Sequence, residues 1–251
     1  MKFMVFALAF LTLAFICSLF AQAGEFSWKL ADEKATLRDW EVISGDWTFK
    51  DGWWEVKSTE AQPGIAVVKE DVAKKLGLYT HDGMICEVTF EDFGDGGWQN
   101  QYIIFAYAPD VDKDHVFQAG QRVGQGNWAI ERMGIPGRAA RVEEHFLRVK
   151  GGTQGTDAVS PKKQYNFKLE IKGDTIITYN NNKEQIRFTI GKDKPEMAGL
   201  NQFKKMPVGR IGISNENAHG HFKNFKVSGP GVRAIEPAGK LATAWCSIKA
   251  Q

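Results

Sequence analysis

The chain has 251 residues, 32 basic and 30 acidic side chains, and a formal net charge of +2 at neutral pH. This near balance gives no electrostatic reason to expect a nucleic acid or an anionic membrane surface as a partner. The length suits one large domain, a size that all-β sandwiches commonly reach.

The first 23 residues have the pattern of an export signal. Lys2 is basic, residues 3–20 are uncharged and almost wholly apolar, and Ala21-Gln22-Ala23 fits the small-x-small rule for cleavage. We therefore expect a signal peptide at 1–23 and a secreted or periplasmic protein that has no membrane span after cleavage. The alternative is an uncleaved membrane anchor, because the apolar run is near the lower length limit for crossing a bilayer.

The next part of the chain predicts a hairpin, a strand and a helix. Asp51-Gly52 separates two alternating apolar segments within residues 40–56, which is a strong hairpin signal. Residues 64–68 form a short strand candidate. Residues 69–78, KEDVAKKLGL, are the only segment in which we predict a helix.

Three strands and a long loop are predicted in the middle of the chain. Residues 101–108 are apolar on both faces, which predicts a central strand, and residues 127–133 predict another. The polar residues 110–126 between them predict a loop. The strand predicted at residues 83–91 alternates, with four apolar side chains on one face: Met84, Cys86, Val88 and Phe90.

The late part of the chain predicts five strands. Residues 165–190 alternate and turn twice, which predicts a three-strand meander. Residues 207–229 predict two strands joined by a polar, glycine-containing hairpin. An extra residue near Lys223-Asn224 would place three apolar side chains on one face, as a β-bulge does: Phe222, Phe225 and Val227.

The number of strands indicates the fold class. Around ten short strands with one short helix predict an all-β fold, an antiparallel two-sheet β-sandwich of jelly-roll type. We expect this sandwich to span residues 24–229. Residues 230–251 have lost the alternation and are expected to be a tail that packs on the sandwich or hangs free.

Several short motifs follow one another in an order that resembles the concanavalin A-like lectin/glucanase superfamily, including its laminin-G-like and 3-keto-disaccharide hydrolase-type domains. The resemblance spans residues 40–229 and implies two curved antiparallel sheets, with ligand met on the concave face or the rim loops. The motifs are Gly45-Asp46-Trp47, Asp51-Gly52-Trp53, Asp82-Gly83, the 165–190 meander, Gly209–Ile213 and Phe222–Val227.

The sequence allows a calcium site but does not establish one, and no other cofactor is expected. Asp110, Asp112 and Asp114 lie at alternate positions and could present oxygens to calcium. The alternative is a solvated acidic loop, and the pattern is not that of an EF-hand. Lys223 stands where the resembling family often has the aspartate of its calcium site, so that site is not expected here.

Glycoside hydrolysis needs two carboxylates about 5 to 10 Å apart. The acid motif of the sandwich-fold glucanases is not present, which leaves three candidates. Glu87 and Glu91 share one strand face, and Glu131 lies on a strand that also bears Trp128. The alternative is that these are outward, solvated acids.

Aromatic side chains are the stronger sign of ligand binding, because sugar rings stack on flat aromatic faces while amides bond their hydroxyls. The alternative for each ring is a place in the core, which we expect for Trp47 and Trp54. The candidates for ligand binding are Trp98, Asn100, Tyr102, Tyr107 and Trp128.

Two cysteines follow the predicted signal peptide. Export would allow a disulfide between Cys86 and Cys246 that ties the tail to the sandwich. The alternative is that Cys86 is a small buried hydrophobe and Cys246 is free.

These observations favour an exported, non-catalytic module that binds a glycan or another cell-surface polymer. Two alternatives stay open: a glycoside hydrolase of the 3-keto-disaccharide hydrolase type, and a structural or adhesive domain.

Overall fold

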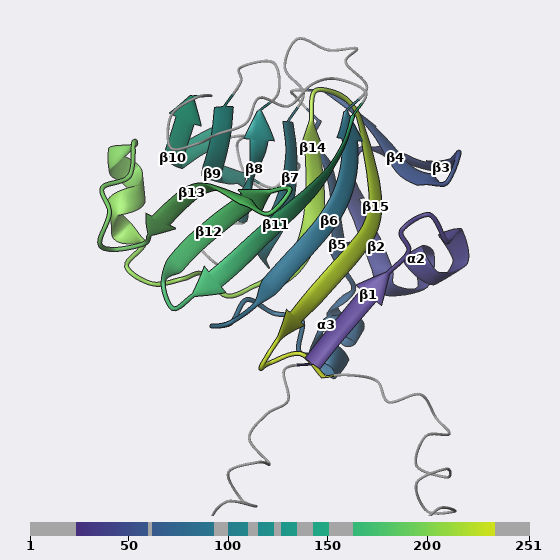
Figure 1. Ribbon diagram of the computed structural model, residues 1–251, viewed down its shortest axis with the longest axis horizontal. Coiled ribbons are helices and arrows are strands. Elements are labelled where there is room, and N and C mark those ends of the chain that lie inside the picture. Colours follow the sequence, from purple (N-terminus) through teal and green to yellow (C-terminus); the bar gives the residue numbers. More distant parts are fainter. Residues whose placement is uncertain are drawn as a thin grey trace, which may run out of the picture.

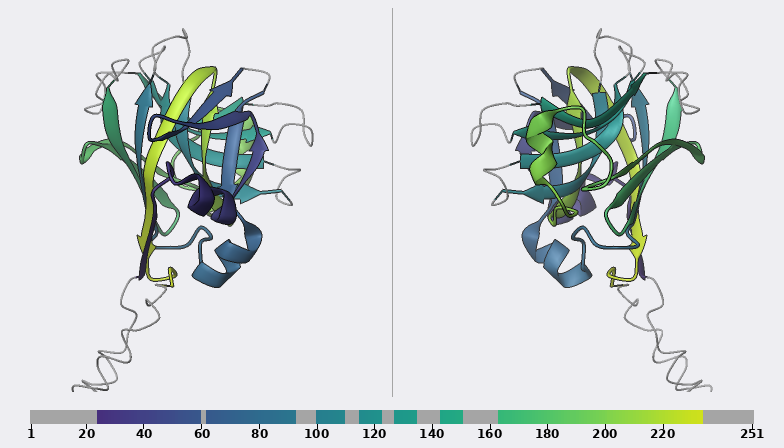
Figure 2. Two further views of the ribbon diagram at one scale, coloured as in Figure 1. Left: turned by 90° about the vertical axis from the view of Figure 1, so that its right-hand side faces the viewer. Right: turned by 90° about the vertical axis from the view of Figure 1, so that its left-hand side faces the viewer.

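The computed structural model describes residues 24–59, 62–92, 100–109, 115–122, 127–134, 143–150 and 163–233. These residues form two antiparallel sheets packed face to face (Figure 1), with the helices α2 and α3 together at one end (Figure 2). The prediction of an all-β, two-sheet sandwich is therefore confirmed. No helix among the described residues is both long and apolar enough to cross a membrane.

Sheet A has the strand order β13-β12-β11-β6-β15-β4-β3, and β1 also pairs with β15. Its strands are β1 (Gly24–Trp28), β3 (Asp46–Lys50), β4 (Trp53–Ser58), β6 (Ile85–Asp92), β11 (Gln164–Lys172), β12 (Thr175–Asn180), β13 (Lys183–Thr189) and β15 (Ala218–Gly229).

Sheet B has the order β10-β9-β8-β7-β14-β5-β2. Its strands are β2 (Trp40–Ser44), β5 (Gly64–Val68), β7 (Asn100–Ala108), β8 (His115–Arg122), β9 (Asn127–Gly134), β10 (Glu143–Lys150) and β14 (Arg210–Glu216). The helices are α2 (Glu33–Asp39), α3 (Glu70–Leu76) and the 3-10 helix η2 (Ala198–Gln202).

The predicted hairpin between β3 and β4 is present. Asp51 has φ +50° and Gly52 has φ +79°, and two successive positive φ angles are what a tight two-residue hairpin turn requires. The meander predicted at residues 165–190 is also present, as β11, β12 and β13.

The two strands predicted at residues 207–229 are present, but the hairpin between them is not: β14 and β15 do not pair with each other, and each is central to a different sheet. β14 lies between β7 and β5 in sheet B, and β15 lies between β6 and β4 in sheet A. The pairing of β15 with β6 shifts register between Lys223 and Lys226, so the predicted bulge is confirmed. As a result Phe222, Phe225 and Val227 all point into the core and are fully buried.

Aromatic rings fill the space between the sheets. Trp40 packs edge-on against Trp28 and Trp54, with ring centroids 5.4 and 5.8 Å apart. Burial of one such side chain stabilises the fold by about 1.5–3 kcal/mol. The alternation predicted for β6 is confirmed by four buried side chains: Met84, Cys86, Val88 and Phe90.

The sequence pattern missed several elements, including β1, η2 and the three that follow. The predicted loop 110–126 contains β8, whose glutamines are buried and mask the hydrophobic alternation. The strand β10 follows in a segment rich in charged residues. The chain also has a second α-helix, α2, which begins where the Asp32 carboxylate caps it by accepting from Ala35 N at 3.0 Å.

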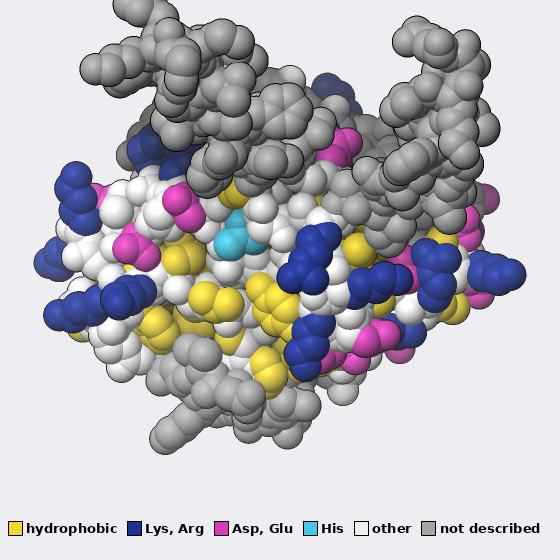
Figure 3. Space-filling view, turned by 90° about the horizontal axis from the view of Figure 1, so that it is seen from below, with side chains coloured by type: hydrophobic (Ala, Val, Ile, Leu, Met, Phe, Trp, Pro, Cys, Tyr) yellow, Lys and Arg dark blue, Asp and Glu magenta, His cyan; other side chains and the backbone are white. Residues whose placement is uncertain are grey.

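The surface seen from below has hydrophobic side chains near its middle and charged side chains of both signs towards its sides (Figure 3). Across the described residues the large hydrophobic side chains that stay exposed are scattered in sequence, which is normal for a folded surface. They are Leu37, Val42, Met197 and Val208.

Candidate functional site

Five polar side chains lie together on the outer face of sheet B, and each is at most 1% exposed. We call them the outer network. Buried polar groups are stable only when they are hydrogen-bonded, so a cluster of this kind at the middle of a sheet needs an explanation. Its members are Asn100, Gln118, Glu131, Ser214 and Glu216.

Strand register brings the outer network together from four strands. Gln118 on β8 is directly opposite Glu131 on β9, and Asn100 on β7 is opposite Glu216 on β14. Ser214 lies two residues before Glu216, so both point to the same face. The site is therefore built by β7, β8, β9 and β14, the middle of the sheet.

Gln118 is the hub of the outer network. Its Nε2 donates to Glu131 Oε1 at 2.7 Å and to Glu216 Oε1 at 3.2 Å. Ser214 Oγ donates to Gln118 Oε1 at 2.5 Å, and Asn100 Nδ2 donates to Glu216 Oε2 at 3.2 Å. Since one nitrogen serves both carboxylates, the two bonded oxygens lie no more than about 6 Å apart.

Gly120 lies beside the outer network at a position where no side chain fits. A Cβ at Gly120 would lie 2.1 Å from the Gln101 carbonyl oxygen and 2.8 Å from Tyr102 Cδ1. No side chain can occupy that space without moving a strand. The ring of Tyr102 therefore lies across Gly120 on the same face as the network.

The same face also has an apolar cluster, which is separate from the main core. The cluster contains Tyr107, a predicted ligand-binding residue, which is 3% exposed. The outer face of sheet B thus has a polar part and an apolar part, a combination typical of small-molecule and sugar sites. The apolar cluster consists of Ile65, Val67, Ile104, Tyr107, Val116 and Met133.

The structure places several of the predicted residues on the outer face of sheet B and one of them in the core. Glu131 and Asn100 belong to the outer network, and Tyr102 is beside it. Trp128 instead packs in the core, with its ring 5.4 Å from that of Phe167. It lies three residues before Glu131 on one strand, and an odd spacing places side chains on opposite faces.

Three network residues were missed by the sequence analysis: Gln118, Ser214 and Glu216. Gln118 lay in the predicted loop. Ser214 and Glu216 lie at alternate positions of β14, on the face opposite to Ile211 and Ile213, so this polar row was visible in the sequence.

Glu87 and Glu91 lie on the outer face of sheet A, as their alternation predicted. Four residues apart on one strand, their Cα atoms are separated by roughly 13 Å, which is longer than the distance between paired glycosidase carboxylates. Glu87 contacts Lys226 at 3.6 Å, and Glu91 contacts His221 at 3.8 Å. The fold therefore gives these two acids different partners.

His221 is the centre of a second polar group, on sheet A. Its Nε2 lies 3.4 Å from Glu55 Oε2, and its ring stacks on Trp53 at 5.4 Å. Burial lowers the pKa of His221, although Glu55 and Glu91 act to raise it. Among the described residues no three His, Cys, Asp or Glu side chains are placed to hold one metal ion.

The structure places one of the two predicted disulfide cysteines, and several other predicted residues lie outside the part of the chain that it describes. Cys86 is free and fully buried, and burial raises the pKa of its thiol. The remaining predicted positions lie outside the described residues: Trp98, Asp110, Asp112, Asp114 and Cys246.

Comparison with known proteins reveals similarity in fold. The sequence matches no protein-family model and no curated protein. A carbohydrate-binding module, CBM66 from Bacillus subtilis, is similar at a TM-score of 0.54 and 14% identity, over 75% of this chain and 94% of that one.

Two further solved structures are similar at comparable levels. A Bacillus subtilis protein of unknown function with a galectin-like fold has a TM-score of 0.54 and 11% identity, over 81% of this chain and 96% of that one. A candidate glycosyl hydrolase from Parabacteroides distasonis has a TM-score of 0.50 and 12% identity, over 76% and 88%. The chain therefore shares the β-sandwich fold of these structures.

Proposed function

We propose that this protein binds a carbohydrate chain on the outer face of sheet B, through the outer network. The observation that carries this proposal is the hub geometry, in which Gln118 joins Glu131, Glu216 and Ser214 on one face. Carboxylates accept hydrogen bonds from sugar hydroxyls, and amides and hydroxyls can both donate and accept.

The surroundings of the outer network support the same ligand class. Asn100 Oδ1 has no hydrogen-bond partner among the described residues, although its side chain is buried. Tyr102 and the apolar cluster next to it would meet the C–H faces of a sugar ring. The likeness in fold to a carbohydrate-binding module adds support by analogy alone.

A glycan array probed with the purified protein tests this proposal. We expect binding to a defined group of glycans that is weakened about tenfold or more in Glu216→Gln, because a carboxylate acceptor is lost. The matched control is Glu87→Gln on the outer face of sheet A, which should bind as the parent does. Absence of glycan binding, or equal binding by Glu216→Gln, would overturn the proposal.

Hydrolysis of a glycosidic bond is the second candidate function, and the spacing of the two acids favours it. The bonded oxygens of Glu131 and Glu216 lie within about 6 Å, near the separation of about 5–5.5 Å that retaining glycosidases use. Glu131 was a candidate from the sequence. The resemblance to 3-keto-disaccharide hydrolase-type domains suggests 3-keto-glycosides as the first substrates.

Product release from 3-keto-glycosides separates the two functions. Turnover that disappears in both Glu131→Gln and Glu216→Gln, while the variants stay folded, would support hydrolysis. Binding without turnover would leave the protein a non-catalytic module and reject the second candidate.

We also propose that the protein is exported and cleaved after Ala23. Intact-mass measurement of the secreted protein under non-reducing conditions tests this, since the mass fixes the new N-terminus. The same spectrum reports whether Cys86 and Cys246 form a disulfide. Because Cys86 lies inside the sandwich, we expect both thiols to be free.

A further inference from the structure

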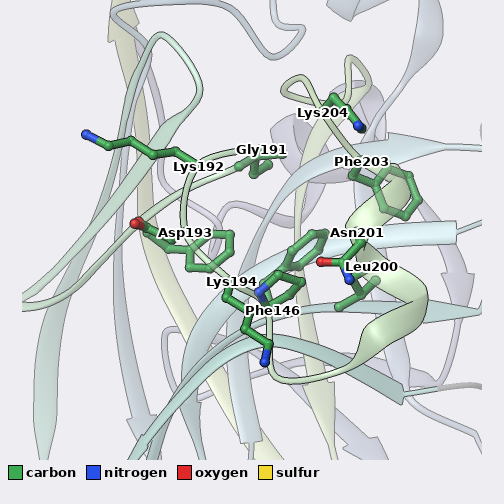
Figure 4. A pocket seen from close by; sticks show the side chains of 12 residues that line it. Phe146, Gly191, Lys192, Asp193, Lys194, Leu200, Asn201, Phe203 and Lys204 are labelled. Atoms are coloured by element: carbon green, nitrogen blue, oxygen red, sulfur yellow. The ribbon is translucent and has the colours of Figure 1, made fainter.

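A cavity of about 340 Å³ lies at the edge of the sandwich, between β13 of sheet A and β10 of sheet B. Residues 191–206, which include η2, pass over it (Figure 4). Its inner wall is apolar and nearly fully buried, apart from the half-buried Phe203, and it comes from both sheets and the connection: Phe146, Phe188, Ile190, Leu200 and Phe203.

The connection that covers the cavity is fastened to both sheets. Glu196 N donates to the Phe146 carbonyl oxygen at 3.1 Å, and Glu196 Oε1 accepts from Arg148 N at 2.5 Å. At the other side Asp193 Oδ2 accepts from Thr189 N at 2.7 Å. The connection over the cavity is therefore attached to both sheets by hydrogen bonds.

Three aromatic rings shape the inner wall. The ring of Phe146 lies 5.8 Å from that of Phe188 and 5.9 Å from that of Phe203, at interplanar angles of 57° and 68°. Tilted rings present both edges and faces, so they can pack around a flat apolar group.

The rim of the cavity is positively charged. Lys192, Lys194 and Lys204 are exposed and leave the connection on different sides of the cavity (Figure 4). Asp193 is the one carboxylate among the described lining residues, and it already accepts the Thr189 amide. The nearby Glu196 is paired with Arg148. The charge available to a ligand is therefore cationic.

We propose that this cavity binds a small organic anion with a compact apolar body, such as an aromatic carboxylate. The apolar body would lie against Phe146 and Phe203, and its charge would face the lysines. The volume is within the usual range of about 300–1,000 Å³ for small-molecule sites. This site is built by other strands than the outer network and is independent of the proposed carbohydrate binding.

Titration of the full protein with 2-naphthoate tests the proposal, with naphthalene fluorescence as the readout. We expect saturable one-site binding that weakens as salt is added. The neutral 2-naphthalenemethanol should bind about tenfold more weakly, because it lacks the charge that the lysines attract. No saturable binding, or equal affinity for the neutral compound, would overturn the proposal.

Variants locate the site. The double variant Lys194→Gln/Lys204→Gln should weaken naphthoate binding about fivefold or more, and Asn201→Trp, at an exposed position of the rim, should block it. The matched control Lys50→Gln/Lys57→Gln removes two exposed lysines from β3 and β4 and should change nothing. Binding that survives Asn201→Trp, or that falls equally in the control, would overturn the assignment.

Discussion

The outer faces of the two sheets are both polar, yet they are built in different ways. On sheet B the outer network is nearly free of solvent contact, and its side chains bond to one another around Gln118. On sheet A the charged side chains pair at the surface, as Lys226 does with Glu25 and Glu87 at 3.3 and 3.6 Å. Lys226 keeps 36% of its side chain exposed.

This difference has an energetic meaning. Exposed ion pairs contribute little because water solvates each partner well, whereas a buried polar group that loses its partner costs much more. Apart from the group around His221, the outer face of sheet A could therefore change without loss of fold. The polar residues of sheet B are fixed by one another.

Replacement of the hub should have the largest effect. Gln118→Leu removes the shared donor of two buried carboxylates, and we expect the free energy of unfolding to fall by about 3–5 kcal/mol. Urea denaturation measures the change. The matched control is Gln164→Leu at an exposed position on the outer face of sheet A, which should change stability by less than about 0.5 kcal/mol. Similar losses of unfolding free energy in both variants would show that the outer faces of sheets A and B do not differ in this way.

Loss of one hydroxyl from each face gives a finer comparison. Ser214→Ala leaves Gln118 Oε1 without the Ser214 donor, so we expect a loss of about 1–3 kcal/mol. Thr89→Ala on sheet A removes an exposed bond to Asn166 and should cost less than about 0.5 kcal/mol. Thermal and urea unfolding of the two variants measure these losses of stability. A larger loss in Thr89→Ala than in Ser214→Ala would contradict the prediction.

The pH dependence of stability should come in part from His221. Burial holds the pKa of His221 below its ordinary value of 6.5, so the unfolded chain binds the proton more readily than the folded one. This contribution to stability is present above pH 6.5 and is lost as the pH falls below it. We expect the free energy of unfolding, measured from pH 5 to 8, to change less with pH in His221→Gln than in the parent protein. An unchanged pH dependence would contradict this role of His221.

Removal of a single surface charge should have the smallest effect. Lys226→Ala breaks contacts to Glu25 and Glu87, and we expect a change of about 0–1 kcal/mol. Added salt should reduce the difference from the parent protein, because exposed charges are screened. A loss that is large and independent of salt would place Lys226 in the same class as the outer network.

The elements that the sequence predicted are those in which hydrophobic alternation decides the packing. In β6 and β15 the described side chains that enter the core are apolar, and even the bulge near Lys223 follows from the spacing of three buried side chains. The strand β8 was missed because Gln118 and Gln121 are buried as well, so polarity did not indicate exposure.

The candidate site was only partly predictable for the same reason. Glu131 was found from its strand. Glu216 lies on β14, five strands later in the sequence, and its position opposite Asn100 depends on the pairing of β14 with β7. The separation of Trp128 from Glu131 could have been predicted, because three residues on a strand change the face.

The central position of β14 and β15 has a consequence for the order of folding. Without residues 210–229 the strands β2 and β5 have no link to β7, and β3 and β4 have none to β6, so each sheet would remain in two pieces. The strand β1 also has no partner until β15 has been made, since Gly24 pairs with Gly229. Contacts between such distant parts of a chain form slowly. A growing chain therefore cannot complete either sheet until β14 and β15 have been synthesised, and truncation before them should abolish cooperative folding.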